Sequence, residues 1–439
     1  MSHTPQHGET CMTATAAPRT PIRSILGASG GNLVEWYDWY AYSAFTLYFA
    51  PALFPKSDPT AQLLSAAAIF AVGFVMRPLG AWIMGVYADR HGRKAGLTVS
   101  VTLMCAGSLL IAATPTFESV GVLAPAMLLI ARLMQGLSVG GEYGASATYL
   151  SEIATSRHRG FYSSFQYVTL IAGQLVALCL ALLLQAILSP AELEAWGWRI
   201  PFVIGGALAI AVFIIRRKME ETKDFLATKA GGAARSTGLA LFREHPRAVA
   251  LVIGLTAGGT VAFYAYSIYM QKFLVNTAGF GRETATAIMT AALFCYMLLQ
   301  PVVGALSDRI GRRPLLIAFG VLGTLGTVPL FQAIAGTAGH PWLAFALVMC
   351  GLVAVSGYTA INAVVKAELF PAHIRALGVA LPYAIANAVF GGSAEYVALL
   401  FKSLGAEQGF YWYVAGLIAI SLIVFVRMGD TRAKSTIGG

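Results

Sequence analysis

Long apolar stretches recur along almost the whole chain and limit what it can fold into. An α-helix rises about 1.5 Å per residue, so about 20 mostly apolar residues are needed to cross the roughly 30 Å of hydrocarbon in a bilayer. Such stretches lie at 24–50, 62–86, 95–114, 120–152, 161–188, 198–215, 249–275, 284–306, 314–335, 341–368, 375–401 and 409–427. The sequence therefore predicts an all-α integral membrane protein with twelve transmembrane helices.

The composition agrees with a chain that faces lipid. Of its 439 residues, 57% are hydrophobic and 11% are charged, whereas soluble domains carry about 25% charged residues. A chain with so few polar groups cannot cover a water-soluble globule of this size. We expect membrane lipid to be its main surroundings.

The basic residues behind the formal net charge of +10 are concentrated in the loops on one side of the predicted membrane. Basic residues follow the second, fourth, sixth, eighth, tenth and twelfth predicted helices, whereas the opposite loops hold chiefly Lys56, Arg199, Arg282 and Lys402. Loops rich in Lys and Arg stay in the cytoplasm. This pattern predicts that both termini are cytoplasmic, and it explains the charge without a nucleic-acid partner.

The usual marks of an enzyme or a metal site are absent from the sequence. The cysteines are Cys11, Cys105, Cys179, Cys295 and Cys350, far apart and without metal-ligand spacing. We find no His-Glu-x-x-His, nucleophile elbow or P-loop. We therefore predict no catalytic residue, metal or cofactor and favour a carrier over a membrane-embedded enzyme, with a channel or a nutrient sensor as further alternatives.

A loop pattern occurs twice and indicates duplication. "GVYADRHGRK" begins at Gly85 and "GALSDRIGRR" at Gly304, and the pair Glu152 and Arg159 is repeated as Glu368 and Arg375 at nearly the same offset. Duplicated halves are common in transporters. The prediction is a cytoplasmic tail at 1–23, six-helix bundles at 24–216 and 248–428, a polar cytoplasmic linker at 217–247 and a tail at 429–439.

The repeated loops also predict a cytoplasmic latch between the halves. Glycine permits close helix approach and tight turns, Asp can cap a helix or pair with Arg, and Arg can clamp a neighbouring helix. Such contacts can break and re-form as the halves rock; the alternative is that these are ordinary topology charges. The predicted latch residues are Gly85, Asp89, Arg90, Gly92, Arg93, Glu152, Arg159, Gly304, Asp308, Arg309, Gly311, Arg312, Glu368 and Arg375.

The duplicated loop resembles the signature of the major facilitator superfamily, Gly-x-x-x-Asp-Arg-x-Gly-Arg-Arg/Lys, with Tyr87 where Leu is usual. "RLMQGLSVGGEYG" from Arg132 is similar to the fourth-helix pattern of its proton-coupled members. "GNLVEWYDWYAYS", "MRPLG", "SEIATSRHRGF" and "WGWRIPF" resemble the metabolite:proton symporter family within it. This resemblance covers about residues 25–426 and implies alternating access by a functional monomer coupled to protons.

Four further stretches narrow the implied substrate. "SSFQYVTLIAGQ", "YMQKFLVNTAG", "VVKAELFPAHIRALGV" and "YAIANAVFGGSAEYVAL" are more similar to family members that carry alpha-ketoglutarate than to those for citrate, shikimate or proline/betaine. The resemblance thus implies import of a dicarboxylate, alpha-ketoglutarate above all. Citrate or another organic acid, an osmolyte such as proline or betaine, and a transporter-like sensor are the alternatives.

Two acids in the first helix are candidates for proton coupling. An ionisable residue at bilayer depth adds about 2.5–3.5 kcal/mol to the free energy of membrane insertion. We therefore expect it to be paired, hydrated or required for function. Glu35 and Asp38 are three residues apart on one helical face, and two close acids in a low dielectric cannot both ionise cheaply. We predict that they line a central cavity, with Asp38 the proton site and Glu35 a modulator or second site.

Arg132 in the fourth helix is the expected basic partner of Asp38. A static ion pair is the alternative to a proton site, whereas the resemblance implies a switchable pair of the first-helix acid and this Arg. Glu142 in the same helix is a further proton-coupling candidate, and Glu395 is an ionisable residue in the eleventh helix.

Deep cations are candidates for binding an organic acid. Arg77 offers a planar fork that suits carboxylates; its alternative role is to partner Glu35 or Glu142. Lys272 and Lys366 are further candidates, although Lys366 lies close to the predicted cytoplasmic end and could extend to water. Arg132 is a fourth cation, and hydrogen bonds to the substrate are predicted from Tyr40, Tyr149, Gln166, Tyr264, Gln271, Tyr383 and Asn387.

Overall fold

The structure is a computed structural model that describes a large part of the chain. It covers residues 22–56, 58–91, 93–139, 147–148, 150–151, 154, 157–217, 238–371, 374–432, 435 and 437. At 22–32, 85–86, 88–91, 93–97, 215–217 and 238–240 it describes the backbone alone. Of the predicted sites, Gly92, Glu142, Tyr149 and Glu152 lie outside the described residues.

Every regular element among the described residues is helical, which confirms the predicted all-α class. The first half contains α1 (Ile22–Leu53), α2 (Pro59–His91), α3 (Arg93–Ala113), α5 (Leu123–Val139), α7 (Arg159–Ile187) and α9 (Ile200–Arg217), together with the short α4 (Phe117–Val120), α8 (Pro190–Ala195) and η1 (Gly197–Arg199). Within the predicted linker, residues 218–237 are outside the described part, and α11 (Gly238–Glu244) follows them.

In the second half, several predicted spans consist of more than one element. They are α12 (Pro246–Tyr264) with η2 (Ala265–Tyr269) and α13 (Met270–Asn276), α14 (Arg282–Ile310), α15 (Arg312–Ala335), α16 (Pro341–Thr359) with α17 (Asn362–Glu368), α18 (Arg375–Ala386) with η3 (Asn387–Gly391) and α19 (Ala394–Ser403), and α20 (Gln408–Arg427). The spans predicted at 249–275, 341–368 and 375–401 are therefore interrupted helices.

Nine helices in the described part are long and apolar enough to cross a membrane, by length and composition. Two shorter apolar helices, Thr98–Ala113 and Leu123–Val139, and α1 cover the remaining predicted spans. On α14, Leu298, Val302, Leu306 and Ile310 are exposed, and their four-residue spacing puts them on one face. Apolar side chains exposed along a whole helix face are what a lipid-facing surface requires.

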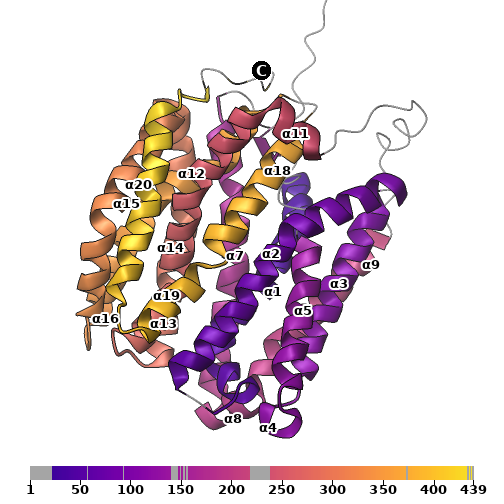
Figure 1. Ribbon diagram of the computed structural model, residues 1–439, viewed down its shortest axis with the longest axis vertical. Helices are drawn as coiled ribbons and strands as arrows, with labels where there is room; N and C mark the ends of the chain where they lie inside the picture. Colours follow the sequence, from indigo (N-terminus) through magenta and orange to yellow (C-terminus); the bar gives the residue numbers. More distant parts are fainter. Residues whose placement is uncertain are drawn as a thin grey trace, which may run out of the picture.

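The halves meet along two interfaces, and the helices of one interface correspond in the repeat to those of the other. In Figure 1 the first half lies to the right and most of the second half to the left. Helix α2 packs against α18, η3 and α19, and α7 packs against α14. Since the second and fifth spans correspond to the eighth and eleventh in the repeat, each interface is the counterpart of the other.

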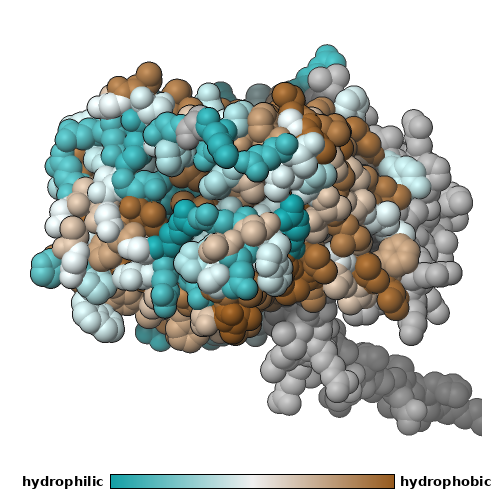
Figure 2. Space-filling model, turned by 90° about the horizontal axis from the view of Figure 1, so that it is seen from below, coloured by the Kyte–Doolittle hydropathy of each residue, from teal (hydrophilic) through white to brown (hydrophobic). Residues whose placement is uncertain are grey.

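We call the end that carries Asp308 and the C-terminal residues the inner end, because its basic loops predict that it faces the cytoplasm. The opposite end, with α4 and α8, is the outer end. Figure 2, which views the molecule from below, shows hydrophilic residues gathered on this end, with hydrophobic residues at parts of its margin. Polar ends and apolar sides are the surface pattern of a protein that spans a bilayer.

Two π-helical segments interrupt the spans at the interface between the halves. They are η2 in the seventh span and η3 in the eleventh, and Thr260 donates a hydrogen bond of 2.6 Å to the Asn387 side-chain oxygen, joining the two spans. Wider helical turns of this type are frequent at functional sites. Gly392, just after η3, packs so closely on Phe74 of α2 that a Cβ would lie 2.3 Å from its ring.

Candidate functional site

Helix α1 contacts the second half on one face and α3 and α5 on another, because successive residues of an α-helix are rotated by about 100° about its axis. Tyr40 and Ser43, three residues apart, face the second half, where they meet Tyr264 and Lys272 respectively. Asp38 faces α3 and α5 within the first half. Asp38 and Tyr40 therefore lie on different faces of α1, and the face of Asp38 is not the one turned toward the second half.

Two hydrogen bonds hold the buried carboxylate of Asp38. The Ser108 hydroxyl donates to one oxygen and the Gln135 amide to the other. Gln135 also accepts a bond of 2.6 Å from Arg132 Nη1. Gln135 thus lies between Asp38 and Arg132, and no direct ion pair joins these two described side chains.

Asp38 accordingly lies inside the first bundle rather than in a cavity between the halves. Its carboxylate also lies against Gly205 of α9, where a Cβ would be 2.6 Å from Oδ1. Glu35 is likewise buried. Sequence reasoning missed Ser108 and Gln135, although Gln135 could have been found: it follows Arg132 by three residues and therefore shares its face.

Arg77 of α2 lies in a box of aromatic rings. Its guanidinium carbon is 4.9, 4.2 and 4.0 Å from the ring centroids of Trp36, Trp39 and Phe74. The side chain is 4% exposed, and its Nε and Nη2 atoms have no hydrogen-bond partner among the described residues. Aromatic faces stabilise a cation but leave its in-plane N–H donors available for an anion.

The ring of Trp39 lies between two guanidiniums. Its centroid is 4.2 Å from Arg77 and 4.5 Å from Arg132, and its backbone oxygen accepts a hydrogen bond of 3.3 Å from Arg132. Arg132 in turn reaches Asp38 through Gln135. One contiguous set of contacts therefore connects Arg77 with the buried acid.

Three predicted tyrosines gather near Arg77 from both halves. Tyr40 of α1, Tyr264 of α12 and Tyr383 of α18 are buried and lie within electrostatic reach of one another and of the Arg77 guanidinium. Asn387, whose amide nitrogen has no hydrogen-bond partner in the described residues, lies next to Tyr264. The structure thus brings five of the predicted polar residues to one place.

Lys366 joins this group from α17. Its ammonium donates a hydrogen bond of 2.8 Å to Asn362 and lies 3.9 Å from the ring centroid of Tyr383. The side chain is fully buried. It therefore does not extend to water, which was the alternative that the sequence left open.

Lys272 contacts an acid and a hydroxyl instead of the cluster around Arg77. Its ammonium is 2.9 Å from Glu395 Oε1, and it donates to the Ser43 hydroxyl at 2.8 Å and to the Ser43 backbone oxygen at 3.1 Å. Ser43 also donates to Glu395 Oε2 at 3.3 Å. We call Ser43, Lys272 and Glu395 the outer triad; sequence reasoning weighed Glu395 but missed its pairing with Lys272 and Ser43.

Of the other predicted polar residues, two are buried and two are not described. Gln271 donates a hydrogen bond of 3.0 Å to Thr286, near the outer end. Gln166 is buried within α7. Glu142 and Tyr149 lie outside the described residues.

At the inner end, Asp308 of the second half caps the first turn of α7 in the first half. Its carboxylate accepts backbone N–H bonds from Gly160 at 2.8 Å and Phe161 at 2.9 Å, and Arg312 donates to it at 2.8 Å. A carboxylate at a helix N-terminus satisfies free amides and complements the helix dipole. This contact holds α7 against α14.

The remaining residues of the predicted latch surround this contact or are not described. A Cβ on Gly304 would lie 2.5 Å from the Gly160 oxygen, so glycine is needed for this approach. Arg312 lies 3.6 Å from Glu368, and Gly311 adopts a φ of 95°, suited to glycine. Arg159 and Arg375 donate hydrogen bonds to backbone oxygens, and Arg309 is exposed. Of Gly85, Asp89, Arg90 and Arg93 the structure describes the backbone alone.

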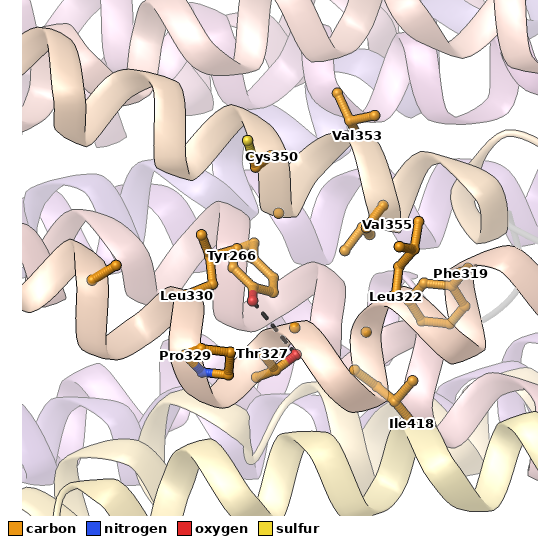
Figure 3. Close-up of a pocket in the computed structure, with 15 residues that line it drawn as sticks. Tyr266, Phe319, Leu322, Thr327, Pro329, Leu330, Cys350, Val353, Val355 and Ile418 are labelled. Atoms are coloured by element: carbon orange, nitrogen blue, oxygen red, sulfur yellow. Dashed lines mark hydrogen bonds between the residues drawn. The ribbon is translucent and has the colours of Figure 1, made fainter.

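An apolar cavity of about 420 Å³ lies elsewhere, between α15, α16, α20 and η2. Figure 3 shows its lining, in which the one dashed line joins Tyr266 to Thr327. Leu322 and Val353 on its rim are exposed on the apolar side of the molecule. Because no charged side chain lines it, this cavity does not provide the site for an anion.

Comparison with known proteins agrees with the helical membrane fold. Residues 24–240 match the family described as "Sugar (and other) transporter", and residues 260–438 match "Major Facilitator Superfamily". A solved structure of a D-xylose-proton symporter superposes with a TM-score of 0.75 at 18% identity, covering 94% of this chain and 99% of that one. The chain belongs to the major facilitator superfamily of membrane transporters.

Relatives of known description place the chain more closely within this superfamily. It is 53% identical to the alpha-ketoglutarate permease of Escherichia coli K12 over 408 residues, which cover 92% of this chain and 93% of that protein. It is 34% identical to the citrate-proton symporter of Klebsiella pneumoniae over 93% of both chains. Its identity to the proline/betaine transporter of E. coli K12 is 30%, over 94% of this chain and 84% of that one.

The inner contact gives a first prediction. Asp308→Asn removes the charge that binds two amides and Arg312, and hydrogen bonds to charged groups contribute about 1.5–3 kcal/mol. We expect the inner end to open more often, so that a cysteine at the buried Ser164, beside Gly304, reacts about tenfold faster with a thiol reagent. The assay uses a background in which the five native cysteines are replaced.

Arg309→Gln is the control for this prediction. Arg309 follows Asp308 directly but is exposed, so its replacement should leave the labelling rate within twofold. Equal rates in Asp308→Asn and the parent would contradict a latch role for this carboxylate.

Proposed function

We propose that this protein is a proton-coupled symporter that imports a dicarboxylate, alpha-ketoglutarate, by alternating access. The observation that carries the proposal is Arg77, a buried guanidinium whose close partners among the described residues are aromatic rings and the tyrosine cluster. A buried cation without an ion-pair partner is expensive unless an anion completes it. The identity of 53% to an alpha-ketoglutarate permease supports the choice of anion.

The second cation near Tyr383 supports a substrate with two carboxylates. Lys366 lies 3.9 Å from the Tyr383 ring, and Tyr383 also lies within electrostatic reach of Arg77. We infer that Arg77 binds one carboxylate with its planar fork and that Lys366 attracts the other. Tyr40, Tyr264 and Asn387 supply hydrogen bonds to the remaining oxygens.

Import of a dianion requires accompanying cations. An inside-negative potential opposes each negative charge by about 2.3 kcal/mol per 100 mV, so protons that enter with the substrate make uptake favourable. We propose Asp38 as a proton site, with Glu35 as a modulator and Arg132 as its responsive partner. Because Trp39 contacts both Arg132 and Arg77, a shift of Arg132 on protonation of Asp38 reaches the substrate site.

Alternating access would follow from contacts between the halves at both ends. At the inner end Asp308 caps α7; toward the outer end Gln185 of α7 binds Thr286 of α14, and Glu194 pairs with Arg282 at 2.6 Å. We propose that substrate and proton binding allow one set to break while the other holds. The inner set then acts as the cytoplasmic latch.

The setting of this activity follows from the topology. We propose that the protein works as a monomer in a bacterial inner membrane, with both termini in the cytoplasm and with protons as the coupling ion. It needs no cofactor or metal and makes no chemical change in its substrate, as befits a chain whose curated relatives are named permeases, transporters and symporters.

The proposal as a whole is tested with purified protein in liposomes. An inward proton gradient should drive accumulation of labelled alpha-ketoglutarate, and collapsing the gradient should abolish accumulation because the dianion then has no driving force. Unlabelled citrate and betaine serve as competitors. Accumulation that survives loss of the gradient would refute proton coupling, and competition by citrate but not by alpha-ketoglutarate would transfer the proposal to a citrate symporter.

Arg77→Lys tests the substrate site. A lysine keeps the positive charge but loses the fork that binds a carboxylate through two bonds, so we expect the KM for alpha-ketoglutarate to rise at least tenfold. Arg199→Lys is a matched control, because Arg199 also stacks on a tryptophan, at 4.2 Å, but already donates to two backbone oxygens. A similar KM in Arg77→Lys and the parent would exclude Arg77 from the site.

Asp38→Asn tests the proton site. The amide can keep its contact with Ser108 but cannot take up a proton, so proton-driven accumulation should fall at least tenfold while exchange of external for internal substrate persists. Glu35→Gln should keep at least a third of the accumulation if Glu35 is a modulator. The exposed Glu283→Gln is the control for amide substitution. Full accumulation in Asp38→Asn would remove it from the coupling mechanism.

A further inference from the structure

The outer triad lies between the proposed substrate site and the outer end. Ser43 follows Tyr40 by three residues on one face of α1, so the triad lies one turn outward of the tyrosine cluster. Lys272 and Glu395 are 0% and 5% exposed as side chains. Further outward lie Tyr48 and Gln185, joined at 2.5 Å. The triad therefore lies on the outer side of the proposed substrate site.

The triad also joins the two halves. Lys272 on α13 and Glu395 on α19 belong to the second half, whereas Ser43 on α1 belongs to the first. The ammonium of Lys272 makes two bonds to Ser43, and Glu395 receives one from it. Movement of α1 away from the second half would break all three of these bonds but would leave the ion pair of Lys272 and Glu395 intact.

Four elements bring a charged or titratable group near Glu395. Lys272 of α13 contacts it directly, and Arg132 of α5, Tyr42 of α1 and Tyr269 of η2 lie within its electrostatic reach. Arg132 is also linked to Asp38 through Gln135. Glu395 is thus the acid of the second half that shares a cation with the proton site proposed in the first.

We propose that Glu395 is a second proton-coupling residue, which competes with a carboxylate of the substrate for Lys272. This inference rests on the proposed function and adds a role for the second half of the molecule. In the empty carrier the Glu395 carboxylate holds Lys272. The substrate gains this lysine only when Glu395 takes up a proton and ceases to be its counter-ion.

The exchange leaves Lys272 with a counter-ion in both the empty and the loaded carrier. A proton from the outer solution binds the Glu395 carboxylate, so the ion pair becomes a neutral acid beside a lone ammonium. Such an ammonium is costly in a low dielectric, and a substrate carboxylate restores its partner. After the inner end opens, the substrate leaves, the proton passes to the cytoplasm and Glu395 again pairs with Lys272. Return of the empty carrier thus requires a carboxylate at position 395.

Glu395→Gln mimics the protonated state permanently. Lys272 then stays available to the substrate, so exchange of external for internal alpha-ketoglutarate in liposomes should remain within threefold of the parent. Net proton-driven accumulation should fall at least tenfold, because the empty carrier lacks the counter-ion for its return. Unchanged accumulation in Glu395→Gln would overturn the proposal.

A double variant separates this role from a purely structural ion pair. Lys272→Gln with Glu395→Gln removes both charges and leaves no buried charge without a partner, so it should fold even if the single variant does not. We expect weak accumulation and a KM at least fivefold above the parent. If the double variant accumulated substrate within twofold of the parent, the pair would be structural and the proposal wrong.

Equilibrium binding provides a readout that a structural role would not change. In the parent, affinity for labelled alpha-ketoglutarate should fall as pH rises, because ionised Glu395 reclaims Lys272. Glu395→Gln should flatten this dependence, whereas Glu118→Gln should not; Glu118 pairs with Lys56 at 2.8 Å but at the exposed surface, where such pairs contribute little. An equally steep dependence in Glu395→Gln would refute the competition.

The same measurements distinguish failure of this inference from failure of the proposed function. If the parent neither binds nor accumulates alpha-ketoglutarate, the proposed function fails, and the variants are then compared with the organic acid that does bind. If the parent binds and accumulates it but Glu395→Gln behaves like the parent in all three assays, only the inference about Glu395 fails.

Discussion

The cost of an unpaired charge in a low-dielectric interior governs the arrangement of this protein. Most of its buried cations meet that cost with polar partners: Arg312 with Asp308 and Glu368, Lys272 with Glu395, and Arg132 with Gln135 and a backbone oxygen. Arg77 is held by aromatic faces and makes no ion pair with a described side chain. This difference is the reason for proposing that an anion binds at Arg77.

The duplicated architecture gives these charges their mechanical context. Two related interfaces join the halves, and polar contacts cross between them at both ends. A cap such as Asp308 on α7 can be broken without exposing apolar core, because helix amides can turn to water at the membrane surface. Rigid bundles with breakable polar contacts at their ends are suited to rocking around a central site.

Communication between the buried acid and the proposed substrate site needs no long pathway. Trp39 contacts both Arg77 and Arg132, and Gln135 connects Arg132 to Asp38. Arg132 also lies within electrostatic reach of Glu395, which binds Lys272. The solved relatives share the fold at 18% identity, but this order of charges is a property of the residues in this chain.

The sequence by itself determined the helical membrane fold, the duplication and the presence of costly charges, because apolar length, repeated motifs and composition are local properties. It could also have indicated Gln135, which shares a helix face with Arg132. It could not decide that Asp38 faces the interior of one bundle, that Lys366 is fully buried or that Lys272 pairs with Glu395 and Ser43. Those facts depend on how each helix is rotated and where spans are interrupted, and only packing between segments distant in sequence sets them.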